Sequence, residues 1–441
     1  MRLHQLEQLF DDPLFQSCTN IGLAGGEPTI SSFFWELLGI LTHNKHITIT
    51  TNALSSKKLV DFLARSPNRK KYLVQLSLDG DEEINDKIRG VKGAFRKTSA
   101  LLATLRDLDV ERLISFTINR LNYHQLTNCY NFANDFGARF SARMAHHGGA
   151  YENKESQKLF EFTERELVVI DDSIKQIVLN ELEKSDVSPA HLIFLSKITE
   201  YYRGKQKDLP CMALESAVLI DLYGDVFPNC PSLLRPLGNL HEESLSSIWE
   251  GSKAAKLRDH IDQLKCGGCW NDCQLVSNIA LNKPYLLKEF SKLKIASLNN
   301  KSVPEKITFT DDDSQLLLNG WYHLEGDSRF RFRWTEQEFS ILIPKGTVAI
   351  KMNAAAPSNF NDFPIFMDVM IDQYDTDRIV INNSEWTGHS IPLLRPTLEL
   401  TPVTFRLNRY YCPQEEGGGR DTRKLGLSVH NISFQTVGTL Q

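Results

Sequence analysis

Five of the eight cysteines in this 441-residue sequence lie in its middle third. Thiolates grouped in this way, with a Cys-x2-Cys pair among them, are typical of a metal site. Four thiolates hold either tetrahedral zinc or an iron–sulfur cluster, and the spacing does not separate the two. The alternative is a group of buried cysteines without metal. The candidate ligands are Cys211, Cys230, Cys266, Cys269 and Cys273.

A second group of polar residues follows short β-branched segments in the N-terminal third. Gly25 and Gly26 lack Cβ atoms and let a ligand approach the backbone, and Glu27 can accept a hydrogen bond from an ammonium group. An arginine suits a carboxylate, and serine and aspartate suit hydroxyl groups. The set therefore fits a zwitterionic ligand that carries a ribose, whereas each residue taken alone also fits a loop cap. The remaining members are Asn52, Ser77, Asp79, Arg89 and Asn119.

Parallel strands must position these polar residues. Stretches with apolar residues at three- and four-residue spacing separate the β-branched segments and predict helical crossovers. Strands joined by such crossovers form a parallel sheet, and ligands bind at the carboxyl ends of its strands. The five predicted strands are Asn20–Ala24, Ile47–Thr51, Leu73–Leu78, Leu113–Ile118 and Arg139–Met144.

Changes of pattern along the chain predict a multidomain protein. Residues 1–150 read as an α/β unit, 151–206 as a helical connector and 207–300 as a small α+β cysteine-rich domain. Residues 305–441 carry short alternating strands separated by turn residues, which predict an all-β sandwich. Its predicted strands are Ile307–Thr310, Arg329–Trp334, Ser340–Ile343, Val348–Met352, Ile365–Ile371, Arg378–Ile381, Val403–Asn408 and Leu425–Phe434.

Composition excludes several classes of protein. Fifty basic residues against 55 acidic residues give a net charge of −5, which argues against a nucleic-acid-binding protein. No run of 18 apolar residues predicts a membrane span, and the acidic residues near Met1 do not fit a signal peptide. We therefore expect a cytoplasmic protein with neither nucleic-acid nor membrane partners.

The string LAGGEPTI, from Leu23 to Ile30, resembles the Gly-Gly-Glu motif of the radical S-adenosylmethionine (SAM) superfamily. The strings TTNAL and VQLSLDGDEEINDKIRGVKGAF are similar to later strand segments of the same family. This resemblance covers residues 1–150 and implies a partial (βα) barrel, a form of the TIM barrel. It implies that Gly25, Gly26 and Glu27 contact the methionyl part of SAM. Ser77 and Asp79 would then lie near the ribose or sulfonium, and Arg89 near the carboxylate.

Radical SAM enzymes carry a Cys-x3-Cys-x2-Cys loop that holds the catalytic [4Fe–4S] cluster. Here Cys18 is the one cysteine ahead of Gly25, and one thiolate does not replace three. No catalytic residue is therefore identified in the sequence. A fragment, a start codon placed too late, or loss of the chemistry each account for this difference, and we expect truncation. A catalytic cluster is then expected only with a longer N-terminus.

Residues 211–275 resemble the SPASM/twitch extension that follows many radical SAM cores. The match includes the Gly-Asp-Val hairpin before Cys230, a Leu-Gly-Asn-Leu linker and the Cys266-x2-Cys269 pair. The resemblance implies one auxiliary [4Fe–4S] cluster. It gives Cys211, Cys230, Cys266 and Cys269 as ligands, with Cys273 competing for one position.

The C-terminal region has aromatic and charged residues close together. Trp321, Tyr322, Glu325, Trp334 and Trp386 combine ring faces with hydrogen-bonding groups, as a sugar-binding groove requires. The region is similar to β-sandwich modules of bacterial glycan enzymes. The alternative is a sandwich core that buries the tryptophans while arginines alternate outward.

The resemblance implies an oxidoreductase that cleaves SAM reductively and abstracts hydrogen from a peptide or glycan-related substrate. Its electron donor would be a flavodoxin or a ferredoxin. The alternative is a non-catalytic SAM- or carbohydrate-binding scaffold that retains one structural iron–sulfur or zinc site.

Overall fold

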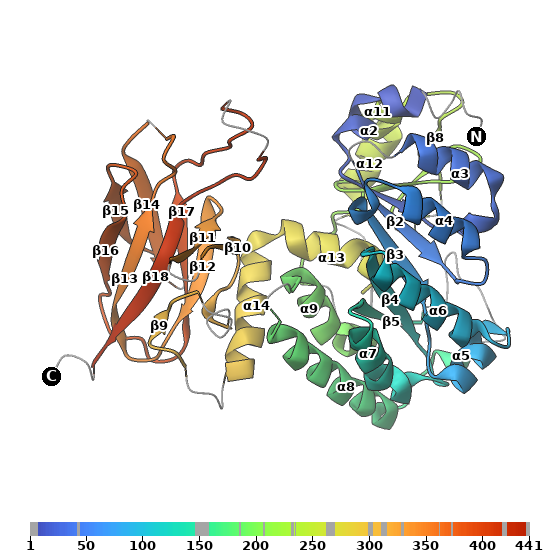
Figure 1. Cartoon of the computed structure of the whole chain (residues 1–441), viewed down its shortest axis with the longest axis horizontal. Coiled ribbons are helices and arrows are strands. Elements are labelled where there is room, and N and C mark those ends of the chain that lie inside the picture. The colour runs from blue at the N-terminus through green and yellow to red at the C-terminus, as the bar shows by residue number, and fades with distance from the viewer. Residues whose placement is uncertain are drawn as a thin grey trace. The chain divides into compact units, whose positions relative to one another are not determined.

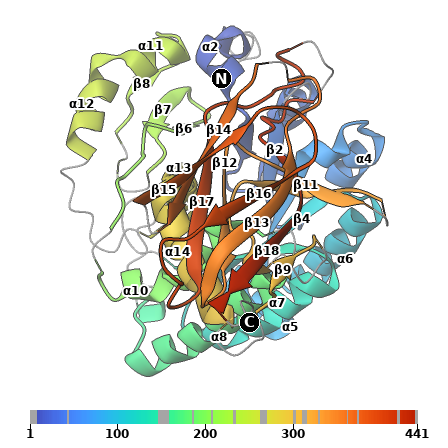
Figure 2. The same ribbon diagram turned by 90° about the vertical axis from the view of Figure 1, so that its left-hand side faces the viewer.

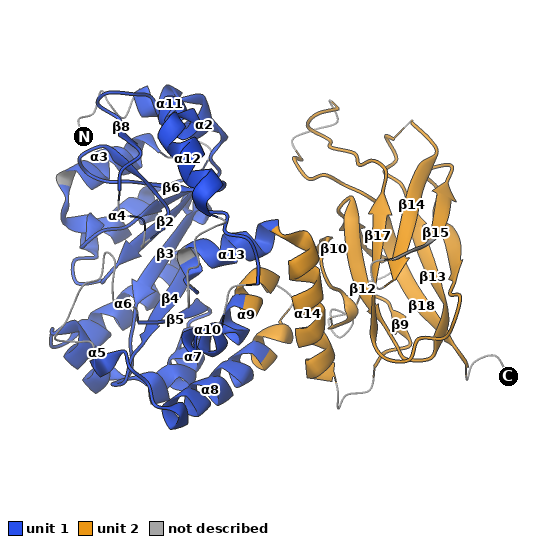
Figure 3. Cartoon of the chain, turned by 180° about the vertical axis from the view of Figure 1, so that it is seen from behind, with its two compact units in different colours: residues 1–178, 194–281 blue, residues 179–193, 282–441 orange. Residues whose placement is uncertain are grey.

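A computed structural model gives the architecture of the chain (Figure 1). It divides into two compact units, residues 1–178 with 194–281 and residues 179–193 with 282–441 (Figure 3). The predicted domain boundaries remain predictions. The structure describes residues 8–41, 45–145, 158–184, 187–205, 208–230, 233, 235–261, 270–298, 303–309, 315–327, 330–360, 362–371, 374–416 and 421–437.

The first unit contains a five-stranded, wholly parallel sheet in the order β1-β2-β3-β4-β5. Its strands are β1 (Asn20–Leu23), β2 (His46–Thr51), β3 (Tyr72–Ser77), β4 (Glu111–Ile118) and β5 (Arg139–Met144). Each strand lies within two residues of its predicted position. The helices of this part are α2 (Pro13–Ser17), α3 (Ser32–Ile40), α4 (Lys57–Arg65), α5 (Glu82–Arg89), α6 (Ala94–Asp107) and α7 (Leu126–Asp135).

Local sequence fixes the loop between β3 and α6. The Asp81 side chain accepts a hydrogen bond from Ile84 N at 3.0 Å and so begins α5. Gly90 ends α5 with φ of +66°, a left-handed conformation that favours glycine. Asp86 then binds the backbone N–H groups of Gly93 and Phe95, which orders the start of α6. This loop holds Arg89 at the carboxyl edge of the sheet.

The cysteine-rich segment of the first unit is built on a three-stranded antiparallel sheet, β6 (Val218–Ile220), β7 (Asp225–Pro228) and β8 (Gly238–Asn239). Gly224 closes the predicted hairpin with φ of +83°. The helices are α11 (Leu245–Glu250), α12 (Ser252–Ile261) and α13 (Asp272–Leu281). Ahead of this segment lie α8 (Glu164–Leu182), α9 (Pro189–Ser196) and α10 (Ile198–Tyr202).

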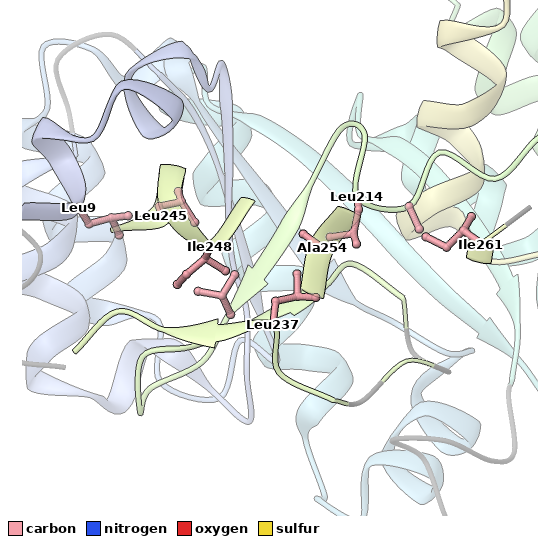
Figure 4. Close-up of a cluster of buried hydrophobic side chains, with 9 residues drawn as sticks. Leu9, Leu214, Leu237, Leu245, Ile248, Ala254 and Ile261 are labelled. Carbon is pink, nitrogen blue, oxygen red and sulfur yellow. The ribbon is translucent and has the colours of Figure 1, made fainter. Parts of the chain in front are cut away.

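A hydrophobic cluster joins this segment to the N-terminal helix (Figure 4). Leu9 belongs to one buried cluster with Leu237, Leu245 and Ile248, and Leu14 and Phe15 of α2 pack against that cluster. The Asp12 carboxylate caps α2 by accepting from Leu14 N at 2.9 Å. It also accepts from Ser246 N at 2.9 Å and from Ser246 Oγ at 2.6 Å, at the start of α11. Residues far apart in the sequence therefore share one core.

The second unit contains α14 (Lys283–Leu298) and two antiparallel sheets (Figure 2). The six-stranded sheet comprises β9 (Lys306–Ile307), β10 (Trp321–Gly326), β11 (Arg331–Thr335), β13 (Thr347–Ala355), β16 (Thr387–Pro392) and β18 (Ser428–Thr436). The four-stranded sheet comprises β12 (Glu338–Ile343), β14 (Ile365–Ile371), β15 (Tyr374–Ile381) and β17 (Thr401–Leu407).

Aromatic side chains from the two sheets of this unit meet in its core. Trp321 of β10 lies edge-on to Phe339 of β12, with ring centroids 5.0 Å apart. Phe339 stacks on Phe405 of β17 at 4.9 Å. The sequence analysis missed β10 and β16, whereas it placed a strand at each of the other eight positions. No helix among the described residues is long and apolar enough to cross a lipid bilayer.

Candidate cofactor site

A cavity of about 300 Å³ lies at the carboxyl ends of β1, β2 and β3. Five of the predicted cofactor residues line it: Gly25, Gly26, Asn52, Ser77 and Arg89. The remaining lining residues are Thr50, Thr51, Leu54, Asn85, Ala94 and Thr98. The parallel sheet thus brings together residues that lie up to 73 positions apart, from Gly25 to Thr98. The volume lies at the lower end of the range for small-molecule sites.

The backbone of the Gly-Gly pair leaves open space. A Cβ atom built on Gly25 or Gly26 would meet no atom within 4 Å. Gly25 has φ of +153°, where a residue with a side chain would be strained. A ligand can therefore reach the peptide groups of both residues.

Glu27 connects the ends of β1 and β2. Its Oε1 accepts hydrogen bonds from Thr29 Oγ1 at 2.6 Å and Thr51 Oγ1 at 2.9 Å. Its Oε2 accepts from Asn52 N at 2.7 Å. Glu27 is absent from the lining of the cavity. In this structure the carboxylate therefore fixes the Gly-Gly turn against the next strand, a role that the sequence analysis did not assign.

Asp79 and Arg89 form an ion pair beside the cavity. Arg89 Nη2 lies 2.5 Å from Asp79 Oδ2, and the side chain of Asp79 is 4% exposed against 29% for Arg89. Asp79 Oδ1 also accepts from Thr117 N at 2.8 Å. Burial raises the pKa of Asp79, while Arg89, Thr117 N–H and Arg143 act in the opposite direction. Asp79 thus positions Arg89 and is not itself among the lining residues.

Arg89 retains hydrogen-bonding capacity beyond this pair. Its Nε is buried and has no hydrogen-bond partner within the part of the chain that the structure describes. A guanidinium can donate five hydrogen bonds in a fixed planar arrangement. The side chain is 29% exposed and lines the cavity, so its accessible part suits an anionic group of a ligand.

Asn85 is one of the six lining residues outside the predicted set. It is fully buried, and its Oδ1 accepts from Asp79 N at 3.0 Å. Asn85 and Arg89 lie four residues apart on α5, so they share one face of the helix. The four-residue spacing from Arg89 could have indicated in the sequence that Asn85 faces the same site.

Asn119 makes hydrogen bonds within the loop that follows β4. Its Oδ1 accepts from Leu121 N at 2.9 Å, and its own N–H donates to Asn122 Oδ1 at 2.7 Å. It is 8% exposed and is not among the residues that line the cavity. The geometry is that of a loop cap after β4.

Two of the predicted cluster ligands have described side chains. Cys211 and Cys230 are both half-buried, and both pack against the hydrophobic cluster of the cysteine-rich segment. Cys230 follows β7 in a turn where its N–H donates to Pro228 O at 2.7 Å. Cys266 and Cys269 lie outside the described residues, and Cys273 lies in α13. Half-buried thiols at the end of a hairpin fit thiolate ligation chemically.

Within the described residues, no group of three His, Cys, Asp or Glu side chains converges as a metal site. The side chains of three of the five predicted ligands fall outside that search. The ligand set therefore remains a prediction from sequence.

The start of α13 is joined to the parallel sheet. Asp272 Oδ1 lies 3.3 Å from Arg143 Nη1 on β5, and Arg143 Nη2 donates to Ser115 Oγ on β4 at 2.6 Å. Trp270 stacks between Tyr201 and Phe194, with its ring centroid 3.8 Å and 5.9 Å from theirs. The residues around Cys273 are thereby fixed against the sheet that carries the cavity.

Known proteins are similar to the cysteine-rich segment and to a longer part of the chain. Residues 211–273 match the SPASM family, described as an iron-sulfur cluster-binding domain. The AdoMet-dependent heme synthase of Methanosarcina barkeri is 24% identical over 272 residues, which cover 56% of this chain and 73% of that protein. The PqqA peptide cyclase of Bradyrhizobium diazoefficiens is 24% identical over 247 residues, 53% of this chain and 60% of that protein.

A solved structure, native anSMEcpe with bound AdoMet, is similar at 17% identity and a TM-score of 0.46. The similarity covers 68% of this chain and 91% of that structure. The chain spans less than two thirds of the peptide cyclase, so the activity of that whole protein does not carry over directly. The SPASM match and these relatives agree with the Gly-Gly-Glu and cysteine motifs, and the chain is a radical SAM/SPASM protein.

Proposed function

We propose that the chain binds SAM in the cavity at the carboxyl ends of β1–β3 and holds one auxiliary [4Fe–4S] cluster in residues 207–300. The observation that supports SAM binding best is the cavity itself. It combines an open Gly25–Gly26 backbone with a guanidinium whose partner, Asp79, is buried. Such a fixed cation beside exposed peptide groups suits a ligand with both a carboxylate and an ammonium.

The carboxylate, the ammonium and the ribose hydroxyls of SAM would each have a counterpart on the cavity wall. Arg89 would bind the methionyl carboxylate, and the carbonyl groups of Gly25 and Gly26 would accept from its ammonium. Ser77 and Asn52 would bind the ribose hydroxyls, since both can donate and accept hydrogen bonds. Three further residues would not touch SAM but would fix the loops that carry its ligands: Glu27, Asp79 and Asn119.

The cysteine-rich segment would supply four thiolates from Cys211, Cys230, Cys266, Cys269 and Cys273 to the auxiliary cluster. Iron is preferred over zinc because the matching family is an iron–sulfur family. The Arg143–Asp272 pair would hold that cluster's segment in a constant position relative to the sheet. A flavodoxin or ferredoxin would be the external electron donor.

We propose a peptide as the substrate class, because a relative of this chain is a peptide cyclase. Reductive cleavage of SAM would need a second [4Fe–4S] cluster held by further thiolates. Cys18, which donates to Asn20 O at 2.9 Å, is the one thiol ahead of Gly25 in this sequence and does not hold such a cluster by itself. For the residues of this sequence we therefore propose SAM binding and auxiliary-cluster binding.

The test is anaerobic purification and reconstitution of the chain, followed by iron, sulfide and zinc analysis and by SAM equilibrium dialysis. We expect about four iron and four sulfide per chain, as a single [4Fe–4S] cluster requires, and saturable SAM binding. Zinc without sulfide would contradict the auxiliary cluster. Absence of saturable SAM binding would contradict the assignment of the cavity.

A further inference from the structure

Aromatic side chains gather at the surface of the six-stranded sheet in the second unit. Phe330 is 39% exposed and Trp386 is 40% exposed, and the two rings are in contact with each other. Phe332 and His430 lie beside them and are half-buried. We call these four residues the aromatic platform.

The rings of the aromatic platform fix one another. Phe330 stacks on His430 with centroids 4.3 Å apart and planes 10° apart. Trp386 stands nearly perpendicular to Phe330 at 5.0 Å and lies 6.1 Å from Phe332. The Nδ1 atom of His430 is 2.7 Å from Arg331 O, which fixes the imidazole plane. The platform is therefore ordered before any ligand arrives.

A charged group lies next to the aromatic platform. Glu325 of β10 is the register partner of Phe332 on β11, so the two side chains emerge on the same face of the sheet. Arg423 Nη1 lies 2.6 Å from Glu325 Oε1, and Arg423 Nη2 lies 2.7 Å from Asp421 Oδ2. About a third of each of these side chains is exposed. We call Glu325, Asp421 and Arg423 the charged rim.

The core of this unit does not account for the platform. Trp321 already fills the space between the two sheets, and its Nε1 donates to Ser340 O at 2.9 Å. Of the tryptophans in this unit, Trp386 is instead left at the surface. Exposed apolar patches that are rimmed by polar or charged residues are typical of binding sites.

We propose that the aromatic platform and the charged rim bind an uncharged glycan. The apolar C–H face of a pyranose ring packs on an aromatic face, and its hydroxyl groups project in the ring plane, where donors and acceptors are needed. The rim offers both, because two carboxylates accept and one guanidinium donates. Its net charge of −1 disfavours anionic sugars. This inference is independent of the proposed SAM site.

The test uses the full chain and four neutral oligosaccharides: cellohexaose, xylohexaose, maltohexaose and chitohexaose. Binding is measured by isothermal titration calorimetry and by tryptophan fluorescence. We expect saturable binding of at least one sugar, a loss of at least about tenfold in affinity in Trp386→Ala and Phe330→Ala, and partial retention in Trp386→Phe. Tyr223→Ala, which removes a 77% exposed ring from the first unit, is the matched control and should bind normally.

Four outcomes overturn the proposal. They are binding of none of the four sugars, wild-type affinity in Trp386→Ala, binding of a proline-rich peptide in place of the sugars, and self-association that Trp386→Ala abolishes. Thermal unfolding of each variant separates loss of binding from loss of fold. Because Trp386 and Phe330 are both more than a third exposed, we expect their unfolding midpoints to stay close to that of the wild type.

Discussion

Replacement of Arg89 by glutamine tests the role of its guanidinium in the cavity. Hydrogen bonds to a charged group contribute about 1.5–3 kcal/mol, so losing them should weaken SAM binding by about 10- to 150-fold. The same change leaves the carboxylate of Asp79, whose side chain is 4% exposed, without its counter-ion. Breaking a buried pair in this way costs about 3–5 kcal/mol of folding free energy. Arg89→Gln therefore combines a binding loss with a stability loss.

The double variant Asp79→Asn/Arg89→Gln separates these two effects. The new asparagine amide can still accept the hydrogen bond from Thr117 N, and no charge remains buried, so most of the stability should return. SAM binding should stay as weak as in Arg89→Gln. Asp79→Asn alone keeps the guanidinium and should bind SAM more tightly than either Arg89 variant.

The assays are SAM equilibrium dialysis under anaerobic conditions and urea unfolding of the same preparations. Arg96→Gln is the control, because Arg96 pairs with Glu82 at 2.6 Å on an exposed surface and does not line the cavity. Wild-type SAM affinity in Arg89→Gln would refute the assignment of the carboxylate to Arg89. Recovery of SAM binding in the double variant would show that Arg89 acts through stability alone.

Three further predictions concern the rest of the first unit. Cys230→Ala should lose most of the iron that the reconstituted chain binds, whereas Cys18→Ser should keep it; equal iron content in the two variants would exclude Cys230 as a ligand. Asp12→Ala should cost about 1–3 kcal/mol at pH 7, because its partners at Leu14 and Ser246 lose a buried acceptor. Burial raises the pKa of Asp12, but the hydrogen bonds from Ser246 and Leu14 together lower that pKa by more than burial raises it. The pKa of Asp12 in the folded chain is therefore below its ordinary value. The Asp12 carboxylate thus stabilises the folded chain at pH values above its ordinary pKa of 3.8. This stabilisation is lost as the pH falls through the lower pKa of the folded chain, so the urea midpoints of wild type and variant should converge in acid. Gly224→Ala should destabilise the chain by about 1–3 kcal/mol, because φ is +83° and a Cβ would lie 3.1 Å from His241; thermal unfolding that matches the wild type would refute this.

The parallel sheet was predictable because its signal is local. β-branched runs such as His46–Thr51 alternate with amphipathic stretches, and each polar residue after a strand falls at one edge by topology alone. Five of the residues that line the cavity could be found in this way, namely Gly25, Gly26, Asn52, Ser77 and Arg89. Which of them face a ligand could not, since Glu27 and Asp79 are engaged by neighbours 24 to 38 residues away.

The two strands that the sequence analysis missed have a common physical reason. β10 and β16 are the two ends of the β10-β11-β18-β13-β16 path, so each lies at an edge of the six-stranded sheet. Edge strands are partly solvated and often polar, which weakens the alternation that reveals a strand. The burial of β16 follows this rule, because four of its six residues are exposed. Interior strands such as β14 were predicted to the residue.

The contact between Asp12 and Ser246 also bears on synthesis of the chain. The two residues are 234 positions apart. At about 5–20 residues per second, roughly 12 to 50 s pass between their appearance on the ribosome. During that interval α2 has neither its hydrophobic cluster nor the N–H groups of α11. The N-terminal helix must therefore wait for the cysteine-rich segment, and we expect nascent chains that end before Leu245 to leave α2 open to proteases and chaperones.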